Sequence, residues 1–388
     1  MYKKRKRGNR VIYLDYTATT PLNKEVRETY TKLLTEKFAN PDSIHHLGLE
    51  TENLMNKSRQ LISEMLKVKY DEIIFTSGAS EANNTAIKGV GFQYQNRGKH
   101  IITSTCEHSS VYETCKQMEQ FGFEVTYINV NQKGELDLQQ LQQAIRKDTI
   151  LVSIMHINNE VGFINPIDQI VKIVRKANPL TKIHIDMVQS FGKVPIDLSQ
   201  IDLASFSAHK IYGLKGSGML YKKENCQIVP LISGGQQEFH LRAGTSNVFT
   251  NIVLAKTIRL ALQDLPKKLE YVKSLNQYLV HALEKKEGVV INTPRTNGSP
   301  YIVNVSFIGY KPEVFVHELE KYEIYVSTRS ACSTKSSNMS RTLEMMGVDP
   351  KMGESAIRIS LSALSTKEEL DVFLNAVDQT MQNLKKQR

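Results

Sequence analysis

The residues with the clearest chemical meaning in this sequence are a lysine and an aspartate 24 positions apart. Lys210 ends the run Ser-Ala-His-Lys, while Asp186 and Gln189 lie in the run His-Ile-Asp-Met-Val-Gln. A lysine that follows a strand can hold pyridoxal phosphate (PLP) as a Schiff base, and a buried aspartate can pair with the pyridine nitrogen. Ser-Ala-His-Lys alone is equally compatible with a surface loop. Together the two runs predict a PLP site, where the ring is an electron sink for a carbanion at Cα.

Other polar runs follow predicted strands, where ligands bind in open α/β sheets. Residues 76–81 precede a predicted helix, and small residues there let backbone N–H groups approach a phosphate, although Ser and Gly often serve only as an N-cap. His108 follows the next strand and can stack on the ring, although a single His is more often structural. Asn159 follows a third strand and can bond the cofactor or a substrate carboxylate.

Two further loops carry candidate groups. Residues 242–247 form a polar run with a glycine, which is either an ordinary turn or a phosphate contact. Cys332 lies in a Ser-rich stretch without apolar periodicity. We therefore expect this cysteine to be exposed, unlike most cysteines.

Short β-branched runs alternate with amphipathic stretches, which predicts a parallel sheet with helices on both faces. Strands are expected at 72–76, 100–103, 124–128, 149–154 and 182–185, with helices at 81–94, 110–121, 137–146 and 166–177. A long charged helix at 257–285, broken near Pro266, leads to a strand at 301–307 and helices at 312–321 and 366–385. We therefore expect a large domain at 14–256 and a smaller α/β domain at 257–388, joined by residues 1–13.

Composition excludes several classes of protein. The 388 residues are 40% hydrophobic, enough for two cores. No run approaches the roughly 18 apolar residues of a membrane span, and the N-terminus lacks the apolar segment of a secretory signal. The four cysteines have neither CxxC nor zinc spacing, so we expect no metal site and a reducing compartment, the cytoplasm.

The net charge is +10, and six of these charges lie within the first ten residues. Such an arm can contact nucleic acid or an acidic protein. We interpret it as a solvated tail and do not expect direct nucleic-acid binding.

Taken in order, the motifs resemble those of NifS/IscS-type cysteine desulfurases, which belong to the class V aminotransferase group of fold-type I PLP enzymes. The resemblance runs from about Val11 to the C-terminal helix. The matching stretches are Leu14 to Pro21, Asn40-Pro41-x-Ser43-x-His45-x-x-Gly48, Asn158-Asn159-Glu160, Asp186 with Gln189, Ser207 to Lys210, Arg242-x-Gly244-Thr245, Ser330-Ala331-Cys332 and Ile357 to Ser360. The implied fold is α/β, a mainly parallel seven-stranded sheet between helices with a smaller α/β C-terminal domain.

The resemblance also implies a role for each candidate residue. The catalytic residues would be Lys210, which carries the cofactor, Cys332, which accepts sulfur, and His108, which stacks on the ring. Asp186 would pair with the ring nitrogen and Gln189 would bond O3′. The phosphate would be held by Ala79, Ser80, Ser207 and His209, with Thr245 from the second subunit of a homodimer. Asn159 would contact both cofactor and substrate, and Arg358 the substrate carboxylate.

Two positions depart from the family pattern. Arg329 stands where the family usually has Gly and adds a cation near Cys332, and Leu214 stands where Pro commonly follows the Schiff-base lysine. These changes leave rate and partner choice open but remove no catalytic group.

The implied activity is conversion of L-cysteine to L-alanine with a persulfide on Cys332. A sulfur-acceptor protein would receive the sulfur, either a thiouridine-forming sulfurtransferase in tRNA thiolation or a scaffold in iron–sulfur assembly. The span from Cys332 to Arg358 matches the long-loop branch of the family, and the variant loop resembles desulfurases dedicated to tRNA thiolation. The enzyme alternatives are selenocysteine lyase or another class V aminotransferase or lyase. The non-enzyme alternative is a PLP-fold module that binds nucleic acid or protein through its basic arm.

Overall fold

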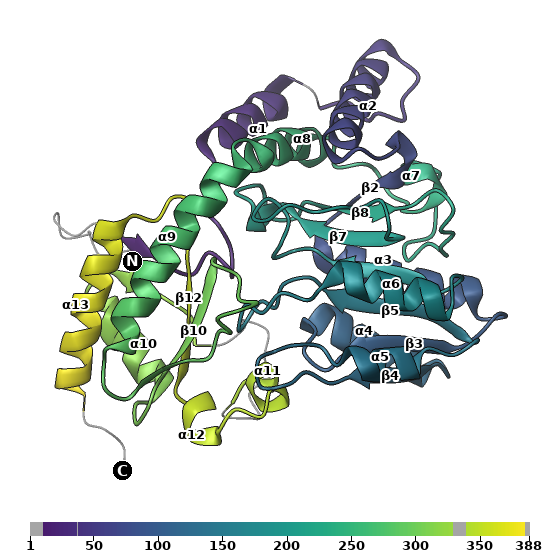
Figure 1. Ribbon diagram of the computed structural model, residues 1–388. Helices are drawn as coiled ribbons and strands as arrows, with labels where there is room; N and C mark the ends of the chain where they lie inside the picture. The colour runs from purple at the N-terminus through teal and green to yellow at the C-terminus, as the bar shows by residue number, and fades with distance from the viewer. Residues whose placement is uncertain (1–10, 37, 329–338, 385–388) are drawn as a thin grey trace.

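A seven-stranded sheet forms the centre of the larger part of the molecule (Figure 1). The computed structural model describes residues 11–36, 38–328 and 339–384. The strand order is β2–β8–β7–β6–β5–β3–β4. All neighbouring strands pair in parallel except β8, which is antiparallel to both β2 and β7. The strands are β2 (Ile73–Thr76), β3 (His100–Ser104), β4 (Glu124–Ile128), β5 (Thr149–Met155), β6 (Lys182–Asp186), β7 (Leu203–Ser207) and β8 (Gly218–Lys222).

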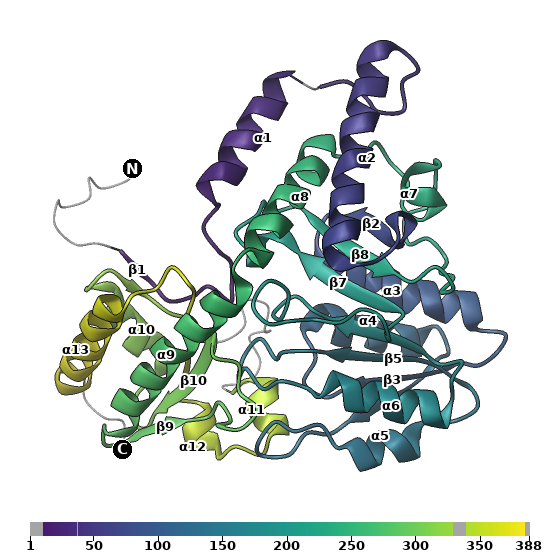
Figure 2. The same cartoon turned by 45° about the horizontal axis from the view of Figure 1, so that its top comes forward.

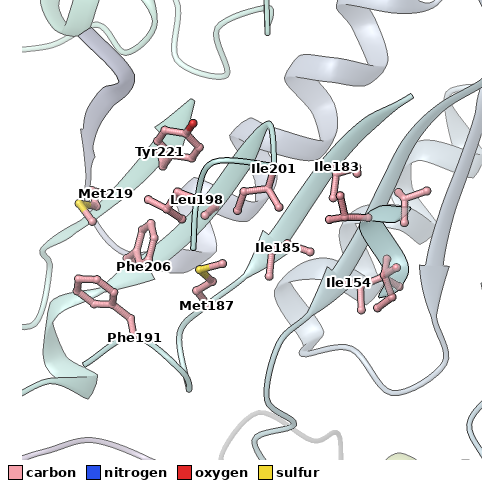
Figure 3. Close-up of a cluster of buried hydrophobic side chains, with 14 of the residues drawn as sticks. Ile154, Ile183, Ile185, Met187, Phe191, Leu198, Ile201, Phe206, Met219 and Tyr221 are labelled. Atoms are coloured by element: carbon pink, nitrogen blue, oxygen red, sulfur yellow. The ribbon is translucent and has the colours of Figure 1, made fainter. Parts of the chain in front are cut away.

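Helices cover both faces of this sheet because neighbouring strand residues point to opposite sides. Ile74 and Ile101 pack against α3 (Ala79–Tyr94) and α4 (Ser109–Gln120). On the other face, the next residues in those strands share a core with α2 (His46–Leu66), α5 (Leu138–Ala144), α6 (Ile167–Ala177) and α8 (Val248–Leu262). Figure 3 shows part of this second core, where Ile183 and Ile185 of β6 lie near Phe206 of β7.

A smaller part surrounds a three-stranded antiparallel sheet in the order β12–β10–β9 (Figure 2). Its strands are β9 (Val289–Ile291), β10 (Ile302–Phe307) and β12 (Ala356–Ser360), and its helices are α9 (Leu265–Glu284), α10 (Pro312–Glu320), α12 (Pro350–Gly353) and α13 (Lys367–Asn383). The short helix α11 (Arg341–Met345) packs its Leu343 in the core of the larger part. The N-terminal strand β1 (Ile12–Tyr13) pairs in parallel with β11 (Ile324–Tyr325). Ile12 and Leu14 therefore join the core of this smaller part.

The junction between the two parts lies between α8 and α9. The predicted helix at 257–285 is wrong at its start, because α8 already begins at Val248. Its predicted break is confirmed: Asp264 has a φ of 54°, and Pro266 lies in the first turn of α9, where proline fits. Ala261 packs in the large core and Val272 in the small one. A domain boundary at 256/257 would divide α8, so the packing favours one near residue 263.

Four further helical segments lie in the described ranges: α1 (Lys24–Glu36), α7 (Gln237–His240) and two short 3-10 turns, η1 (Tyr70–Glu72) and η2 (Ala208–Lys210). Within the described ranges, none of the helices combines the length and apolar character that crossing a bilayer requires.

Candidate active site

A pocket of about 620 Å³ opens where β5, β6 and β7 end. This is the edge at which parallel sheets bind ligands. Residues from both parts of the molecule line it, since β12 contributes Arg358. The lining includes most of the residues singled out in the sequence: Ala79, Ser80, His108, Asn159, Asp186, Gln189, Ser207, His209, Lys210 and Arg358.

Lys210 ends η2, the turn directly after β7. Its Nζ donates to the carbonyl oxygens of Thr17 and Ala18, at 2.7 and 2.8 Å. The Thr17 carbonyl also accepts from Nε2 of Gln189, at 3.2 Å. The N-terminal segment before α1 therefore holds the lysine beside Gln189.

Asp186 is the last residue of β6 and is 5% exposed. One carboxylate oxygen accepts from the backbone N–H of Val188, and the other from Nδ2 of Asn83, at 2.9 Å. The same Asn83 amide donates to Ser110 Oγ at 2.8 Å, and that hydroxyl lies 2.9 Å from Nδ1 of His108. Two polar side chains thus link Asp186 to His108.

His108 is the N-cap of α4 and accepts there from the backbone N–H of Ser110. Burial lowers the pKa of its imidazole, which outweighs the effect of nearby Asp186. A neutral imidazole at the edge of the pocket can stack on an aromatic ring without placing a second cation beside Lys210.

The turn between β2 and α3 is shaped to hold an anion. Gly78 caps α3 without any side-chain hydrogen bond and has a φ of 150°, which favours glycine. The first N–H groups of a helix have no partner within it, and the helix dipole favours a negative group there. A Cβ on Gly218 would lie 2.6 Å from Gly78 Cα, so the close approach of β8 also requires glycine. The residues around this turn fit a phosphate.

The acidic group nearest this turn is paired. Nε of Arg242 lies 3.0 Å from the Glu81 carboxylate, and the backbone N–H of Ser77 donates to it as well. Burial raises the pKa of Glu81, but these hydrogen bonds lower it overall. The pairing reduces the repulsion that Glu81 would exert on a bound phosphate.

Arg358 supplies a guanidinium at the opposite side of the pocket. Its Nη1 donates to the Asn159 carbonyl at 2.9 Å, and Nη2 to Asp15 at 2.9 Å. Among the described residues, Nε has no hydrogen-bond partner. A planar guanidinium with a spare N–H suits a carboxylate.

The sequence matches the class-V aminotransferase family over residues 12–373. The chain belongs to this family. It is 44% identical to the cysteine desulfurase IscS of Dictyoglomus turgidum, covering 97% of this chain and 96% of that protein. A solved NifS-like protein matches with a TM-score of 0.91 at 38% identity, covering 97% of this chain and all of the other. SspA, solved in complex with cysteine, matches with a TM-score of 0.80 at 33% identity, covering 92% of this chain and all of the other.

This protein is thus a NifS/IscS-like cysteine desulfurase, and enzymes of the family use PLP. The predicted family, fold class and cofactor are confirmed. The pocket fits that cofactor, since it joins a lysine, a buried aspartate and an uncapped helix N-terminus.

Two predicted site residues of the desulfurase are not placed in this pocket. Thr245 is exposed and does not line it. Cys332 and Arg329 lie outside the described residues. The roles assigned to both stay predictions.

The other three cysteines are buried and free: Cys106, Cys115 and Cys226. Burial raises the pKa of each thiol to about 12. At neutral pH these thiols are protonated and out of reach, so they do not compete as nucleophiles.

Sequence reasoning missed four polar residues at this site. Asn83 and Ser110 bridge Asp186 to His108, as described above. Glu107 is 3% exposed and accepts from Ser104 Oγ and the Met155 N–H. Lys193 donates to Oε1 of Gln189 at 2.7 Å. Of these four, only Asn83 could have been predicted from the sequence, because it lies four residues after Ala79 and therefore on the same face of α3.

Proposed function

We propose that this desulfurase converts L-cysteine to L-alanine and leaves the sulfur of the substrate as a persulfide on Cys332. The bond between Cβ and the substrate sulfur breaks as a bond between that sulfur and the Cys332 thiolate forms. The carbon retains the electron pair and gains a proton, so cysteine and one enzyme thiol give alanine and one persulfide. The convergence of Lys210, Asp186 and Arg358 on one pocket carries this proposal.

Bound PLP supplies an electron sink for the Cα–H bond of an amino acid. Lys210 would hold the cofactor covalently and, once released, take the Cα proton. Asp186 would keep a proton on the ring nitrogen, and Gln189 would donate to the ring oxygen. His108 would stack on the ring, held there by Ser110 and Asn83. Ala79, Ser80, Ser207 and His209 would bind the phosphate.

Arg358 and Asn159 would bind the substrate carboxylate. Asp15 already occupies one edge of the guanidinium, so the carboxylate would approach the Nε side. This contact would fix the orientation of the Cα–H bond relative to Lys210.

The residues on either side of the Cys332 segment support its role. Ser327, five positions before Cys332, forms backbone hydrogen bonds with Arg358 in both directions, at 3.2 and 2.7 Å. On the far side, Ser340 hydrogen-bonds to the Glu160 carboxylate, next to Asn159. Five residues span at most about 17 Å. These contacts of the flanking residues support the proposal that Cys332 reaches the substrate.

We further propose a homodimer in the cytoplasm that passes its sulfur to an acceptor protein. Persulfide chemistry requires reduced thiols, and the three described cysteines are free. The acceptor would be a thiouridine-forming sulfurtransferase, with an iron–sulfur scaffold as the second candidate, because Arg329 departs from the family pattern.

The deciding experiment follows both products of one turnover. Purified enzyme is incubated with L-cysteine, alanine is quantified, and the Cys332 peptide is examined by mass spectrometry for one added sulfur. Each acceptor class is then added in turn and tested for labelled sulfur. Faster turnover with L-selenocysteine, or with an amino-group acceptor, would instead support one of the other class V reactions.

We expect Cys332→Ser to bind cofactor and L-cysteine normally but to form no persulfide, because the groups that bind both remain in place. Cys226→Ala is the matched control and should keep turnover within a few-fold, since that thiol is buried away from the pocket. Persulfide transfer by the Cys332→Ser protein would show that another thiol does the chemistry.

A further inference from the structure

A second pocket of about 450 Å³ lies on the other side of Lys210. It is enclosed by the segment leading into α1, the α8–α9 junction and the loop after β12. Lys210 lines both pockets, while Asp186, His108 and the phosphate turn line only the first. The two cavities therefore share a wall but have different linings.

Most of the side chains that line the second pocket are apolar or aromatic. The large apolar contributors are Leu22, Val26, Ile211, Leu260, Leu361 and Leu364, and the rings of Tyr16, Tyr212 and Tyr301 add flat surfaces. Ligand pockets of proteins typically measure about 300–1,000 Å³ and combine such a lining with a few polar groups. This cavity meets both criteria.

The charged groups of the second pocket all have one sign. Four lysines line it (Lys24, Lys193, Lys210 and Lys268), and none of the described residues that line it is Asp or Glu. Lys268 is already bound to the carbonyl of Leu260, at 2.8 Å, and Lys24 is largely exposed. The pocket is therefore apolar and cationic.

Lys193 is the buried cation of this group, with 8% of its surface exposed. Its Nζ donates to the neutral amide of Gln189, and in the described part of the chain it makes no salt bridge. The segments outside the described residues contain no Asp or Glu either. Burial, with Lys210 and Arg358 nearby, lowers the pKa of Lys193 to about 7. Near neutral pH this amine is therefore only partly protonated, because a buried ammonium with no counter-ion is costly. An anion in the pocket would relieve that cost and favour the protonated form.

We propose that the second pocket binds a small organic anion, a carboxylate with an apolar body, and that Lys193 is its counter-ion. The apolar body would lie against the leucines and tyrosines of the lining. The carboxylate would complete the hydrogen bonds of an ammonium that has three N–H groups and, among the described residues, one hydrogen-bond acceptor, Gln189, with the Tyr301 ring 6.0 Å away.

The same lysine connects this site to the cofactor pocket. In its ammonium form Lys193 only donates, so it then fixes Oε1 of Gln189 toward itself and leaves Nε2 toward Thr17 and the first pocket. An anion that draws Lys193 away would free the Gln189 amide to turn. Occupation of the second pocket would therefore change the absorbance of the bound cofactor.

The test uses the cofactor-loaded enzyme, in which the first pocket is filled, with octanoate as the probe and calorimetry as the measurement. We expect saturable binding of octanoate, weaker binding of octylamine, and a change in cofactor absorbance at the same octanoate concentration. Lys193→Met should weaken octanoate binding about tenfold or more, the value of one charge-assisted hydrogen bond. Lys222→Met is the matched control: Lys222 is also 8% exposed but lies on β8, bound to the Cys226 carbonyl.

A second variant keeps the test decisive if Lys193→Met fails to fold. Ala363→Trp would fill the pocket from the loop after β12 and leave Lys193 in place. It should abolish octanoate binding while the melting temperature stays close to wild type. Equal binding by wild type and Lys193→Met, or binding only before the cofactor is loaded, would overturn the proposal. None of these measurements depends on desulfuration, so the two proposals fail separately.

Discussion

At the scale of single residues, hydrogen bonds fix the orientation of the polar side chains in the candidate site. Lys210 is held by two backbone carbonyls, which can accept from it but cannot neutralise it. Gln189 is oriented by Lys193, which donates to its Oε1. The site is therefore arranged before any ligand enters, and preorganisation of this kind reduces the cost of binding.

Replacing Lys210 tests the proposed covalent anchor of the cofactor. We expect Lys210→Ala to lose turnover and all covalently held cofactor, because no other amine would take the place of its Nζ beside the Thr17 and Ala18 carbonyls. Borohydride reduction followed by peptide mapping measures the attachment. Lys215→Ala is the control, since Lys215 also lines the pocket and should leave attachment on Lys210 unchanged. Cofactor found on a different lysine would contradict the site assignment.

Glu107 predicts a pH dependence of stability. Burial raises the pKa of its carboxyl from about 4.5 to about 8. The folded state therefore holds a proton that the unfolded state releases above pH about 4.5, so this group's contribution to stability falls as pH rises from there toward about 8. Glu107→Gln keeps the shape and cannot ionise. The stability gained by this variant, relative to wild type, should increase between pH 5 and pH 8 in thermal melts. A constant difference across that range would show that Glu107 is already ionised in the folded protein.

At the scale of elements, the site depends on a link between three separate pieces of structure. Asp186 ends β6, Asn83 lies on α3, and Ser110 and His108 begin α4. Asn83 uses both of its N–H groups in this link, and its Oδ1 has no partner among the described residues. A helix on one face of the sheet thus fixes two groups at its edge.

Removing that link should weaken cofactor binding. Asn83→Ala removes one donor from the Asp186 carboxylate, which keeps only the Val188 N–H, and the donor to the Ser110 hydroxyl, at a cost of about 1–3 kcal/mol for each buried atom left unpaired. We expect an apparent Kd for PLP that is about tenfold or more higher, measured by titrating the apoprotein. Asn84→Ala is the neighbouring control, because the side chain of Asn84 donates to the Ser80 carbonyl at the surface and not to Asp186 or Ser110. Similar Kd values for the two variants would show that Asn83 does not contribute to cofactor binding.

The elements of the sheet could be predicted where a strand is an uninterrupted β-branched run. The strand predicted at 124–128 matches β4 residue for residue, and β3, β5 and β6 differ from prediction only at their ends. β7 and β8 were missed: β7 is Leu-Ala-Ser-Phe-Ser, whose small polar residues are buried only because neighbouring strands and helices enclose them. Asp186 and Lys210 were predictable because motif residues follow strands, whereas Lys193 and Glu107 depend on contacts that no local pattern encodes.

At the scale of the whole molecule, three large apolar side chains that are close in sequence are largely exposed. Phe38, Ile44 and Leu47 are 75%, 95% and 52% exposed. The loop before Thr245 lies beside them, because Gln237 donates to Asp42 at 2.6 Å. Exposed apolar side chains that gather on one surface are typical of protein interfaces. They support the proposed homodimer.

A buried ion pair holds the loop that leads to Thr245. Glu238, Phe239 and His240 all have positive φ, between 48° and 65°, which is unfavourable for residues other than glycine. Two hydrogen bonds of 2.8 Å join Arg59 to the Glu238 carboxylate, which also accepts from the Phe75 N–H of β2. Tertiary contacts therefore fix this loop relative to the strand that leads into the phosphate turn.

The proposed sharing of active sites across the dimer can be tested with a hybrid. If Thr245 binds the phosphate in the partner subunit, Thr245→Ala should raise the apparent Kd for PLP by about tenfold, the value of one hydrogen bond to a charged group.

A dimer of one Thr245→Ala subunit and one Lys210→Ala subunit would then contain one intact site, formed by Lys210 of the first and Thr245 of the second. We expect half of the sites in this hybrid to bind PLP covalently with wild-type affinity. If Thr245 acts within its own chain, every Lys210 in the hybrid faces an altered phosphate site and no wild-type site returns. Sedimentation at the assay concentration completes the test, and an active monomer would contradict the dimer itself.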